Sequence, residues 1–349
     1  MSKTLDSRAV SLSSRRSALD LADRVRAVLA ALSLAWCAFL SVLYLLRPSG
    51  WDPITIWPFI FWAWIGVVFG LASLSRRGKR RSLLVAVIWV IALVSICEEP
   101  RSVLRSVGHG GEKAWQSARA EGRALRVVSL NCGGGVLAAA REAFAREPDI
   151  VLLQERPGMD ELEDVFTKAD GWHGTASFDT AIFVRGDLES LPVAPRQRVF
   201  ISRAAVEPSA LDPPRELEVA SIHLALPATR ADIWRPSTWR VAEQIRQVRA
   251  NQIEAVTTYA AEATGQPSIV GGDFNTPGGD GLLRPLRAHL RDAFREAGIG
   301  WPNTMVNETP ISRIDQVWLS PELEATTLRV LPTQNSDHRM VVCEVALPE

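Results

Sequence analysis

The sequence lacks an excess of charge of either sign, and it lacks repeats and low-complexity segments. Its 349 residues carry 39 basic and 39 acidic side chains, so no global field marks the chain as a nucleic-acid binder. A DNA or RNA substrate is neither demanded nor excluded by this balance. The length suits one domain with a sizeable core plus an appendage.

Cysteine is also scarce. The four cysteines are Cys37, Cys97, Cys132 and Cys343, and none shows a CxxC or other metal-ligand spacing, so we expect no zinc site. Cys132 and Cys343 fall in the first and last strand-like segments of the second half. One alternative is a disulfide between them in an oxidising compartment. The ordinary expectation is that both are buried free thiols.

Long apolar runs are abundant near the N-terminus. They cover residues 27–46, 54–74 and 83–97, and the first two reach the ~20 apolar residues that cross a bilayer. A cleaved signal peptide would have one short run, whereas a second and third run follow closely here. We therefore predict a membrane anchor of about three transmembrane helices. The alternative is a set of buried helices in a soluble protein.

Basic residues predict the orientation of this anchor, because short loops rich in Lys and Arg stay in the cytoplasm. They concentrate in the tail and after the second run: Lys3, Arg8, Arg15, Arg16, Arg24, Arg26, Arg76, Arg77, Lys79, Arg80 and Arg81. We expect a cytoplasmic tail (1–26), an anchor (27–97), a linker (98–122) and a catalytic domain (123–349). The chain would be an integral protein of the cell (inner) membrane with its catalytic domain outside the cytoplasm. If the short third run does not cross, the domain returns to the cytoplasmic side.

The second half alternates short apolar runs with helical stretches. Strands are predicted at residues 125–130, 150–153, 181–184, 219–224, 268–270, 316–319 and 339–345, and helices at 137–146 and 241–263. Pro148 and Gly265 follow the two helices as stop signals. This alternation is typical of a layered α/β unit.

Polar residues lie at the ends of these strands, where a layered α/β protein usually gathers its site. They are Asn131, Glu155, His223, Asp273, Asn275, Asp315, Asp337 and His338. Carboxylate and amide oxygens suit Mg²⁺ or Mn²⁺, and histidines move protons. This set suits hydrolysis of a phosphate ester: Glu155 and Asp337 would hold a metal, and Asp273 would accept a proton from water. His338, held by Asp315, would stabilise the phosphoryl group or donate to it.

The order and spelling of these segments resemble one family, the endonuclease/exonuclease/phosphatase (DNase I-like) superfamily. The matching motifs are SLN, QE, SIHL, GDFN, RID and SDH, and they run from about residue 123 to the C-terminus. Each motif alone is weak, but six in the right order are specific. The resemblance implies an α/β fold, a four-layered αββα sandwich of two mixed sheets.

The resemblance also implies roles for individual positions. Glu155 and Asp337 match the metal-binding positions, with Asn131 close to the metal and to the phosphate. Asp273 and Asn275 match the positions that activate water and hold the phosphate. His338 matches the residue that contacts the scissile phosphate, with help from Asp315, and His223 is typical of the DNase I, sphingomyelinase and phosphoinositide-phosphatase branches.

Two segments depart from the family pattern. Some members carry an acidic residue soon after the strand-terminal Asn, where this chain has Cys132 followed by three glycines. The second departure is at residues 178–182, where Thr180 does not reproduce a common family motif. The expected activity is Mg²⁺- or Mn²⁺-dependent hydrolysis of a phosphodiester, in a nucleic acid or a phospholipid head group, or of a phosphomonoester. The expected partners are this substrate and the bilayer, with no obligate protein partner. The rival is a catalytically inactive, membrane-tethered binding module.

Overall fold

The computed structural model describes residues 3–75, 78–108, 110–163, 165–166 and 170–348, with side chains from Asp20 onward. Arg76 and Arg77, two of the basic residues used to predict orientation, lie outside the described residues. The chain forms two compact units. A helical unit holds the chain up to Pro48 together with Trp57–Pro100, and a second unit holds Ser49–Ile56 together with the chain from Arg101 onward.

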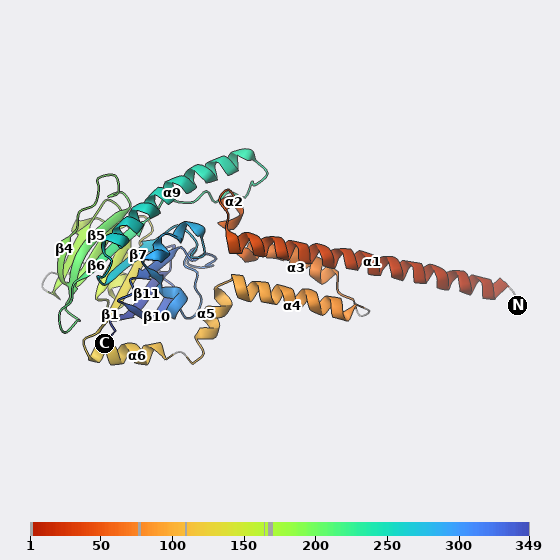
Figure 1. Cartoon of the computed structure of the whole chain (residues 1–349), viewed down its shortest axis with the longest axis horizontal. Helices are drawn as coiled ribbons and strands as arrows, with labels where there is room; N and C mark the ends of the chain where they lie inside the picture. Colours follow the sequence, from red (N-terminus) through yellow and green to blue (C-terminus); the bar gives the residue numbers. More distant parts are fainter. Residues whose placement is uncertain (1–2, 76–77, 109, 164, 167–169, 349) are drawn as a thin grey trace. The chain divides into compact units, whose positions relative to one another are not determined.

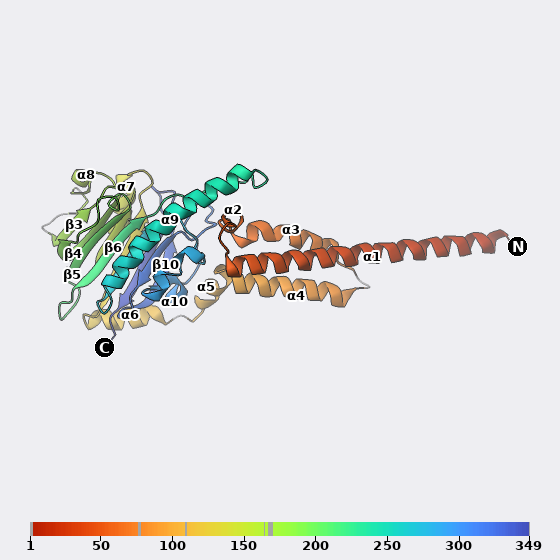
Figure 2. The ribbon, with the colours of Figure 1, turned by 45° about the horizontal axis from the view of Figure 1, so that its top comes forward.

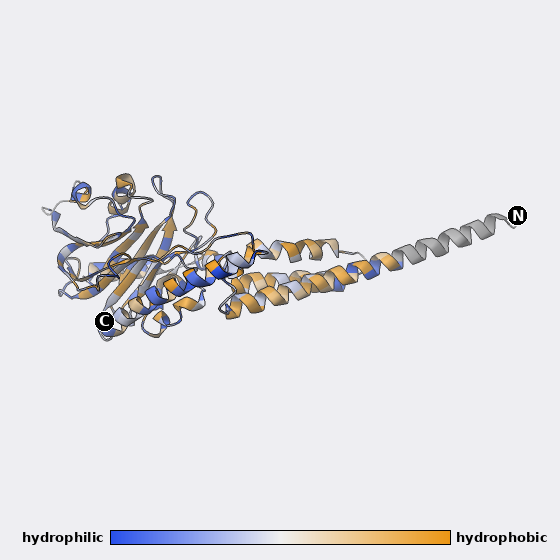
Figure 3. Cartoon of the chain, turned by 90° about the horizontal axis from the view of Figure 1, so that it is seen from above, coloured by the Kyte–Doolittle hydropathy of each residue, from blue (hydrophilic) through white to orange (hydrophobic). Residues whose placement is uncertain are grey.

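The helical unit consists of α1 (Lys3–Leu46), α3 (Phe59–Ala72) and α4 (Lys79–Ile96). Ser33 of α1 joins them, because its Oγ donates to the Gly66 carbonyl of α3 at 2.6 Å and accepts from Trp89 Nε1 of α4 at 2.9 Å. Many outward side chains are apolar, including Leu32, Val42 and Ile60. Figure 3 shows this apolar character along α3, α4 and the coloured part of α1.

The prediction of three membrane-spanning helices was wrong in its number of spans. In the described part of the chain, one helix segment, Asp20–Leu46, is by itself long and apolar enough to cross a membrane. α3 has 14 residues, about 21 Å at 1.5 Å per residue, against a hydrocarbon core of about 30 Å. α4 qualifies only together with α5 (Glu99–Arg105), from which it is bent by 74°. By length and composition, Asp20–Leu46 suits either an anchor or a signal sequence.

The second unit is built on one curled, mixed sheet. Its strands follow the order β10-β11-β1-β2-β4-β5-β6-β7-β9-β8, and β3 pairs with β4 beside this path. The strands are β1 (Ala124–Asn131), β2 (Ile150–Gln154), β3 (Trp172–Ala176), β4 (Thr180–Ser190), β5 (Ile201–Pro208), β6 (Leu217–His223), β7 (Ser268–Asp273), β8 (Arg291–Asp292), β9 (Asp315–Leu319), β10 (Glu324–Leu331) and β11 (Met340–Ala346). The long strand β4 joins the two halves of the sheet, since residues 180–184 pair with β2 and residues 186–190 with β5. Figure 1 shows β4 beside β5 and β6.

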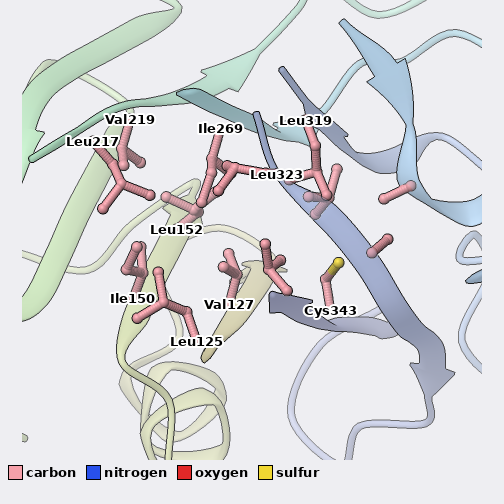
Figure 4. Close-up of a cluster of buried hydrophobic side chains, with 14 of the residues drawn as sticks. Leu125, Val127, Ile150, Leu152, Leu217, Val219, Ile269, Leu319, Leu323 and Cys343 are labelled. Atoms are coloured by element: carbon pink, nitrogen blue, oxygen red, sulfur yellow. The ribbon is translucent and has the colours of Figure 1, made fainter. Parts of the chain in front are cut away.

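Apolar side chains from both halves of the sheet meet in an inner core. Leu125, Val127, Ile150 and Leu152 come from β1 and β2, and they face Val219 and other residues of β6, β7 and β9. Figure 4 shows these side chains pointing toward one another between the strands. The alternation of inward and outward residues along each strand produces this layer.

Helices cover the outer faces. α9 (Pro236–Glu262) packs Ile253 and Val256 on the half with β5, β6 and β7, and Figure 2 shows it running along β6. α7 (Leu137–Phe144) and α8 (Met159–Glu163) cover the half with β1 and β2. The remaining helical elements are α2 (Asp52–Thr55), α6 (Gly111–Ala120), the 3₁₀ turns η2 (Gly281–Leu283) and η3 (Leu286–Ala288), and α10 (Ala293–Ala297). The prediction of a layered α/β unit is therefore confirmed, but the two mixed sheets that the family resemblance implied are one continuous sheet, because β4 pairs with both β2 and β5.

All seven predicted strands and both predicted helices of this unit are present. Strands β3, β5, β8 and β10 were not predicted, because their sequences carry Gly, Ser, Thr and charged residues instead of apolar runs. Residues 101–122, expected to be a linker, pack with the second unit, where Arg119 forms an ion pair with Asp149 at 2.5 Å. Cys132 and Cys343 are buried free thiols, so the ordinary expectation for them is confirmed and the disulfide is not formed.

Strand register brings polar residues to one edge of the sheet. Asp273 at the end of β7 lies opposite His223 of the parallel strand β6 and opposite Asp315 of the antiparallel strand β9. Asn131 at the end of β1 lies opposite Gln154. Gly272 allows the close approach of β6 to β7, since its φ is 140° and a Cβ there would lie 2.0 Å from the Ile222 carbonyl oxygen.

Candidate active site

Asp273 lies at the centre of the polar cluster and is almost fully buried. Its Oδ1 accepts from the Asn275 backbone N–H at 2.8 Å, and its Oδ2 accepts from Asn131 Nδ2 at 3.2 Å. The same Oδ2 lies 3.7 Å from His223 Nε2 and 3.9 Å from His338 Nε2. One carboxylate oxygen therefore faces two imidazoles and one amide.

His338 is held by Asp315, the pairing expected from the sequence. Its Nδ1 lies 2.9 Å from Asp315 Oδ2, and both residues are buried. Ser336 fixes the turn before His338, because its Oγ donates to the Asn131 carbonyl at 2.7 Å and accepts from the His338 N–H at 3.0 Å. With Nδ1 engaged, Nε2 is the ring atom that faces Asp273.

His223 forms a second pair, with a residue that sequence reasoning missed. Its Nδ1 is hydrogen-bonded to Oδ2 of Asp179, which lies just before β4. His223 Nε2 also lies 3.9 Å from Glu155 Oε1. The sequence signal for Asp179 was its place directly before a predicted strand, in the segment that departs from the family pattern.

Glu155 and Asp337, the predicted metal ligands, line one cavity of about 470 Å³ together with Gly133, Glu308 and Ser336, as well as Gln334 and Asn335. Glu155 has a φ of 42°, an uncommon conformation for a residue other than glycine. Its Oε1 accepts from Asn131 Nδ2 at 3.1 Å and its Oε2 from the Gly134 N–H at 2.6 Å. The glycines after β1 thus supply a backbone donor to Glu155.

Asn131 and Asn275 are both buried. The amide of Asn131 presents its Nδ2 to Glu155 and Asp273, while its Oδ1 accepts from the Gly133 N–H at 3.0 Å. Asn275 has a φ of 47°, and its Nδ2 donates to the Leu224 carbonyl at 2.8 Å. Its backbone N–H holds Asp273, so Asn275 shapes the turn beside the central carboxylate.

Burial and neighbouring charges set the protonation of the cluster. Burial raises the pKa of Asp273, and the Asp315 charge adds to it, giving a pKa of about 6 although both histidines oppose the shift. Burial lowers the pKa of His338, but Asp315, Asp273 and Asp337 outweigh it and raise that pKa to about 10. For His223, burial again lowers the pKa, and the bond to Asp179 with the charges of Asp273 and Glu155 brings it above its ordinary value. At neutral pH the cluster therefore holds an ionised Asp273 beside a protonated His338.

Asp273, Asp315 and His338 form a second group with cation-binding spacing, since one ligand atom of each lies within 4.8 Å of the others. Asp315 Oδ1 is buried without a hydrogen-bond partner in the described part of the chain. The imidazole of His338 already occupies this place through its bond to Asp315. Glu155 and Asp337 instead line an open cavity and offer carboxylate oxygens, so they are the better metal candidates.

The site lies within a segment that matches a known family. Residues 128–338 match the model of the endonuclease/exonuclease/phosphatase family, which covers more than half of the chain. The chain therefore belongs to this family of metal-dependent phosphoester hydrolases, and it is an enzyme of this class. A search of the curated proteins finds no matching sequence.

Several solved structures are similar to this chain. An endonuclease/exonuclease/phosphatase family protein from Bacteroides thetaiotaomicron is 16% identical, with a TM-score of 0.50, over 65% of this chain and 98% of that one. A mannosyl-6-phosphatase of the same organism is 16% identical, with a TM-score of 0.48, over 64% and 100%. The endonuclease domain of the TRAS1 retrotransposon is 19% identical, with a TM-score of 0.45, over 65% and 100%.

Proposed function

We propose that the chain is a membrane-anchored, divalent-metal-dependent hydrolase of a phosphodiester or phosphomonoester, in which Asp273 accepts the proton of the attacking water. The observation that carries the proposal is the surroundings of Asp273 Oδ2, which has two imidazole Nε2 atoms within 4 Å. A buried carboxylate with a pKa of about 6 is ionised at neutral pH and remains basic enough to take a proton.

The two histidine–aspartate pairs provide positive charge around this carboxylate. His338, kept protonated by Asp315, faces the point where a phosphoryl oxygen would sit and donates to it through Nε2. His223, which lies at the end of β6 and is oriented by Asp179, contributes the second imidazole. Asn131 and Asn275 fix the carboxylate, and we assign them contacts to the phosphate.

The residues around the cavity fit a hard divalent cation. Glu155 and Asp337 line it, Gly134 and Asn131 orient the Glu155 carboxylate, and oxygen ligands of this kind suit Mg²⁺ or Mn²⁺. When bound, the ion neutralises charge on the phosphoryl oxygens. Asn131 serves here as a metal-side residue that keeps Glu155 in place.

The apolar α1 supports membrane attachment, with the catalytic unit outside the cytoplasm and the basic tail inside. Two substrate classes fit the same chemistry, a nucleic acid and a phospholipid head group. Attachment to a membrane keeps the enzyme near lipid and also retains a nuclease at the cell surface, so it favours neither class.

A metal-dependent activity panel on the purified full chain tests the proposal. The panel contains plasmid DNA, RNA, sphingomyelin, phosphatidylinositol phosphates and chromogenic phosphodiesters. We expect turnover of at least one class, reduced roughly 10²–10⁴-fold in Asp273→Asn. Asp187→Asn, which removes a carboxylate on β4, is the matched control and should retain turnover. Inactivity on every substrate with a folded protein would favour the catalytically inactive binding module.

A further inference from the structure

The segment Ser49–Ile56 follows the first apolar run of the sequence and includes the start of the second, yet it belongs to the compact unit that carries the active site. We call this segment the strap. It contains the short helix α2, which packs on α9 of the same unit. Residues 57–100, which include α3 and α4, therefore begin directly after one part of the catalytic unit and end directly before another.

An ion pair and an aromatic pair hold the strap on α9. Asp52 is hydrogen-bonded to Nη1 of Arg246, and the side chains are only 13% and 11% exposed. The same Nη1 lies 3.4 Å from Oδ1 of Asp280, which caps η2. Trp51 packs edge-on against Trp239, with ring centroids 5.8 Å apart. Removing one partner of a largely buried ion pair leaves the other charge buried and unpaired, which costs stability. The Asp52–Arg246 pair therefore stabilises the strap in its position on α9.

The chain that follows residues 57–100 is also held by contacts within the second unit. Arg105 of α5 donates to the carbonyls of Phe294, Arg295 and Glu296 at 2.8–3.1 Å, at the end of α10. Guanidinium groups at this position satisfy the last carbonyls of a helix and complement its dipole. Gly300 adds a second contact, because its N–H donates to Ser106 Oγ at 2.9 Å.

We propose that the strap and α5 close residues 57–100 into an excursion that leaves and re-enters the same face of the membrane. An ion pair such as Asp52–Arg246 cannot form across about 30 Å of hydrocarbon. α3 and α4 therefore cross together or not at all, and a crossing by α4 alone is excluded. With α1 as the crossing helix, the catalytic unit lies on the face opposite to the N-terminal tail. This inference rests on the proposed membrane attachment.

Single-cysteine labelling of the full chain in intact cells tests the arrangement. In a background with the four native cysteines replaced, Ser49→Cys reports on the strap and Ser190→Cys on the catalytic unit, since both serines are exposed. We expect the two to react equally with a membrane-impermeant maleimide. Lys79→Cys, at the first residue of α4, then reports whether α3 and α4 cross the membrane. Opposite labelling of Ser49→Cys and Ser190→Cys would overturn the inference, whatever Lys79→Cys shows.

A charge exchange tests the docking itself. Asp52→Arg and Arg246→Glu should each lower the unfolding midpoint of the detergent-solubilised chain by roughly 5 °C or more, and the double variant should recover part of the loss. Arg240→Glu, an exposed position on the same helix, should have little effect. Additive losses in the double variant would contradict the docked strap. If the wild-type chain were found in the soluble fraction of lysed cells, membrane attachment would be refuted. The proposed enzymatic activity does not depend on that outcome and is tested separately.

Discussion

His338 Nδ1 and Asp315 Oδ2 lie 2.9 Å apart, although the residues are 23 positions apart in the chain. Asp315 also lies beside Asp273 in the sheet, so the two carboxylates and the imidazole form one electrostatic unit. Asp315 gives His338 its positive charge, and it also raises the pKa of Asp273. One buried carboxylate therefore tunes both an acid and a base.

This coupling predicts non-additive losses. Asp315→Asn and His338→Ala should each reduce turnover, the latter by roughly 10²–10⁴-fold. Asp315→Asn should cost less once His338 is absent, because its action through the imidazole is then already lost and only its effect on the pKa of Asp273 remains. Turnover of the two single variants and the double variant, with folding checked by circular dichroism, gives the coupling. If the fold-losses of the two single variants multiplied in full in the double variant, Asp315 would act independently of His338.

The Asp179–His223 contact predicts a second positioning residue. Asp179→Asn keeps the size of the side chain but removes the charge that favours protonated His223, so turnover should fall roughly tenfold or more. In a His223→Ala background the same change should have little effect. Asp187→Asn on β4 serves as the control. Equal effects of Asp179→Asn in both backgrounds would contradict this role.

The carboxylates of the cavity predict metal dependence. EDTA should abolish activity, and Mg²⁺ or Mn²⁺ should restore it, because hard oxygen ligands favour these ions. Glu155→Gln should raise the metal concentration needed for half-maximal activity about tenfold or more, since it removes a charged ligand. Glu163→Gln, an exposed control at the end of α8, should not. Full activity in excess chelator would be incompatible with the mechanism.

The two perturbed groups predict a bell-shaped pH profile. Asp273 must be ionised to accept a proton, so turnover should rise with pH through its pKa of about 6. His338 must stay protonated, so turnover should fall with pH through its pKa of about 10. Asp315→Asn removes a charge that raises the pKa of His338 and should move the alkaline limb to lower pH. If the alkaline limb did not move in Asp315→Asn, that limb would not report the titration of His338.

Gly272 predicts a stability effect next to the site. Its φ of 140° is unfavourable for any side chain, and a Cβ would lie 2.0 Å from the Ile222 carbonyl oxygen. Gly272→Ala should therefore lower the free energy of unfolding by on the order of 3 kcal/mol or more. Gly110→Ala, at a position with no atom within 4 Å of the added Cβ, should be nearly neutral. Denaturant unfolding of the two variants measures the difference.

Several features were accessible from the sequence because they depend on local pattern. Buried strands such as β1 and β2 are continuous apolar runs, and α9 ends close to Gly265. Strands β5 and β10 were missed because neighbouring strands stabilise them, a contribution that propensity does not measure. The number of spanning helices was overestimated because an apolar run of 21 residues, 54–74, contains a helix of only 14 residues that starts after Pro58.

The sequence by itself determined the family, the layered α/β architecture and the set of polar residues at the strand ends, because each is written in short motifs and their order. Apart from the pairing of His338 with Asp315, which was expected from the sequence, tertiary structure decided which of these residues face one another. The register of β6, β7 and β9 places His223, Asp273 and Asp315 side by side, and the pairing of Asp179 with His223 joins segments 44 positions apart. The docking of the strap on α9 likewise depends on packing between distant segments. Such contacts depend on strand pairing and side-chain packing across the whole unit, which no local pattern specifies.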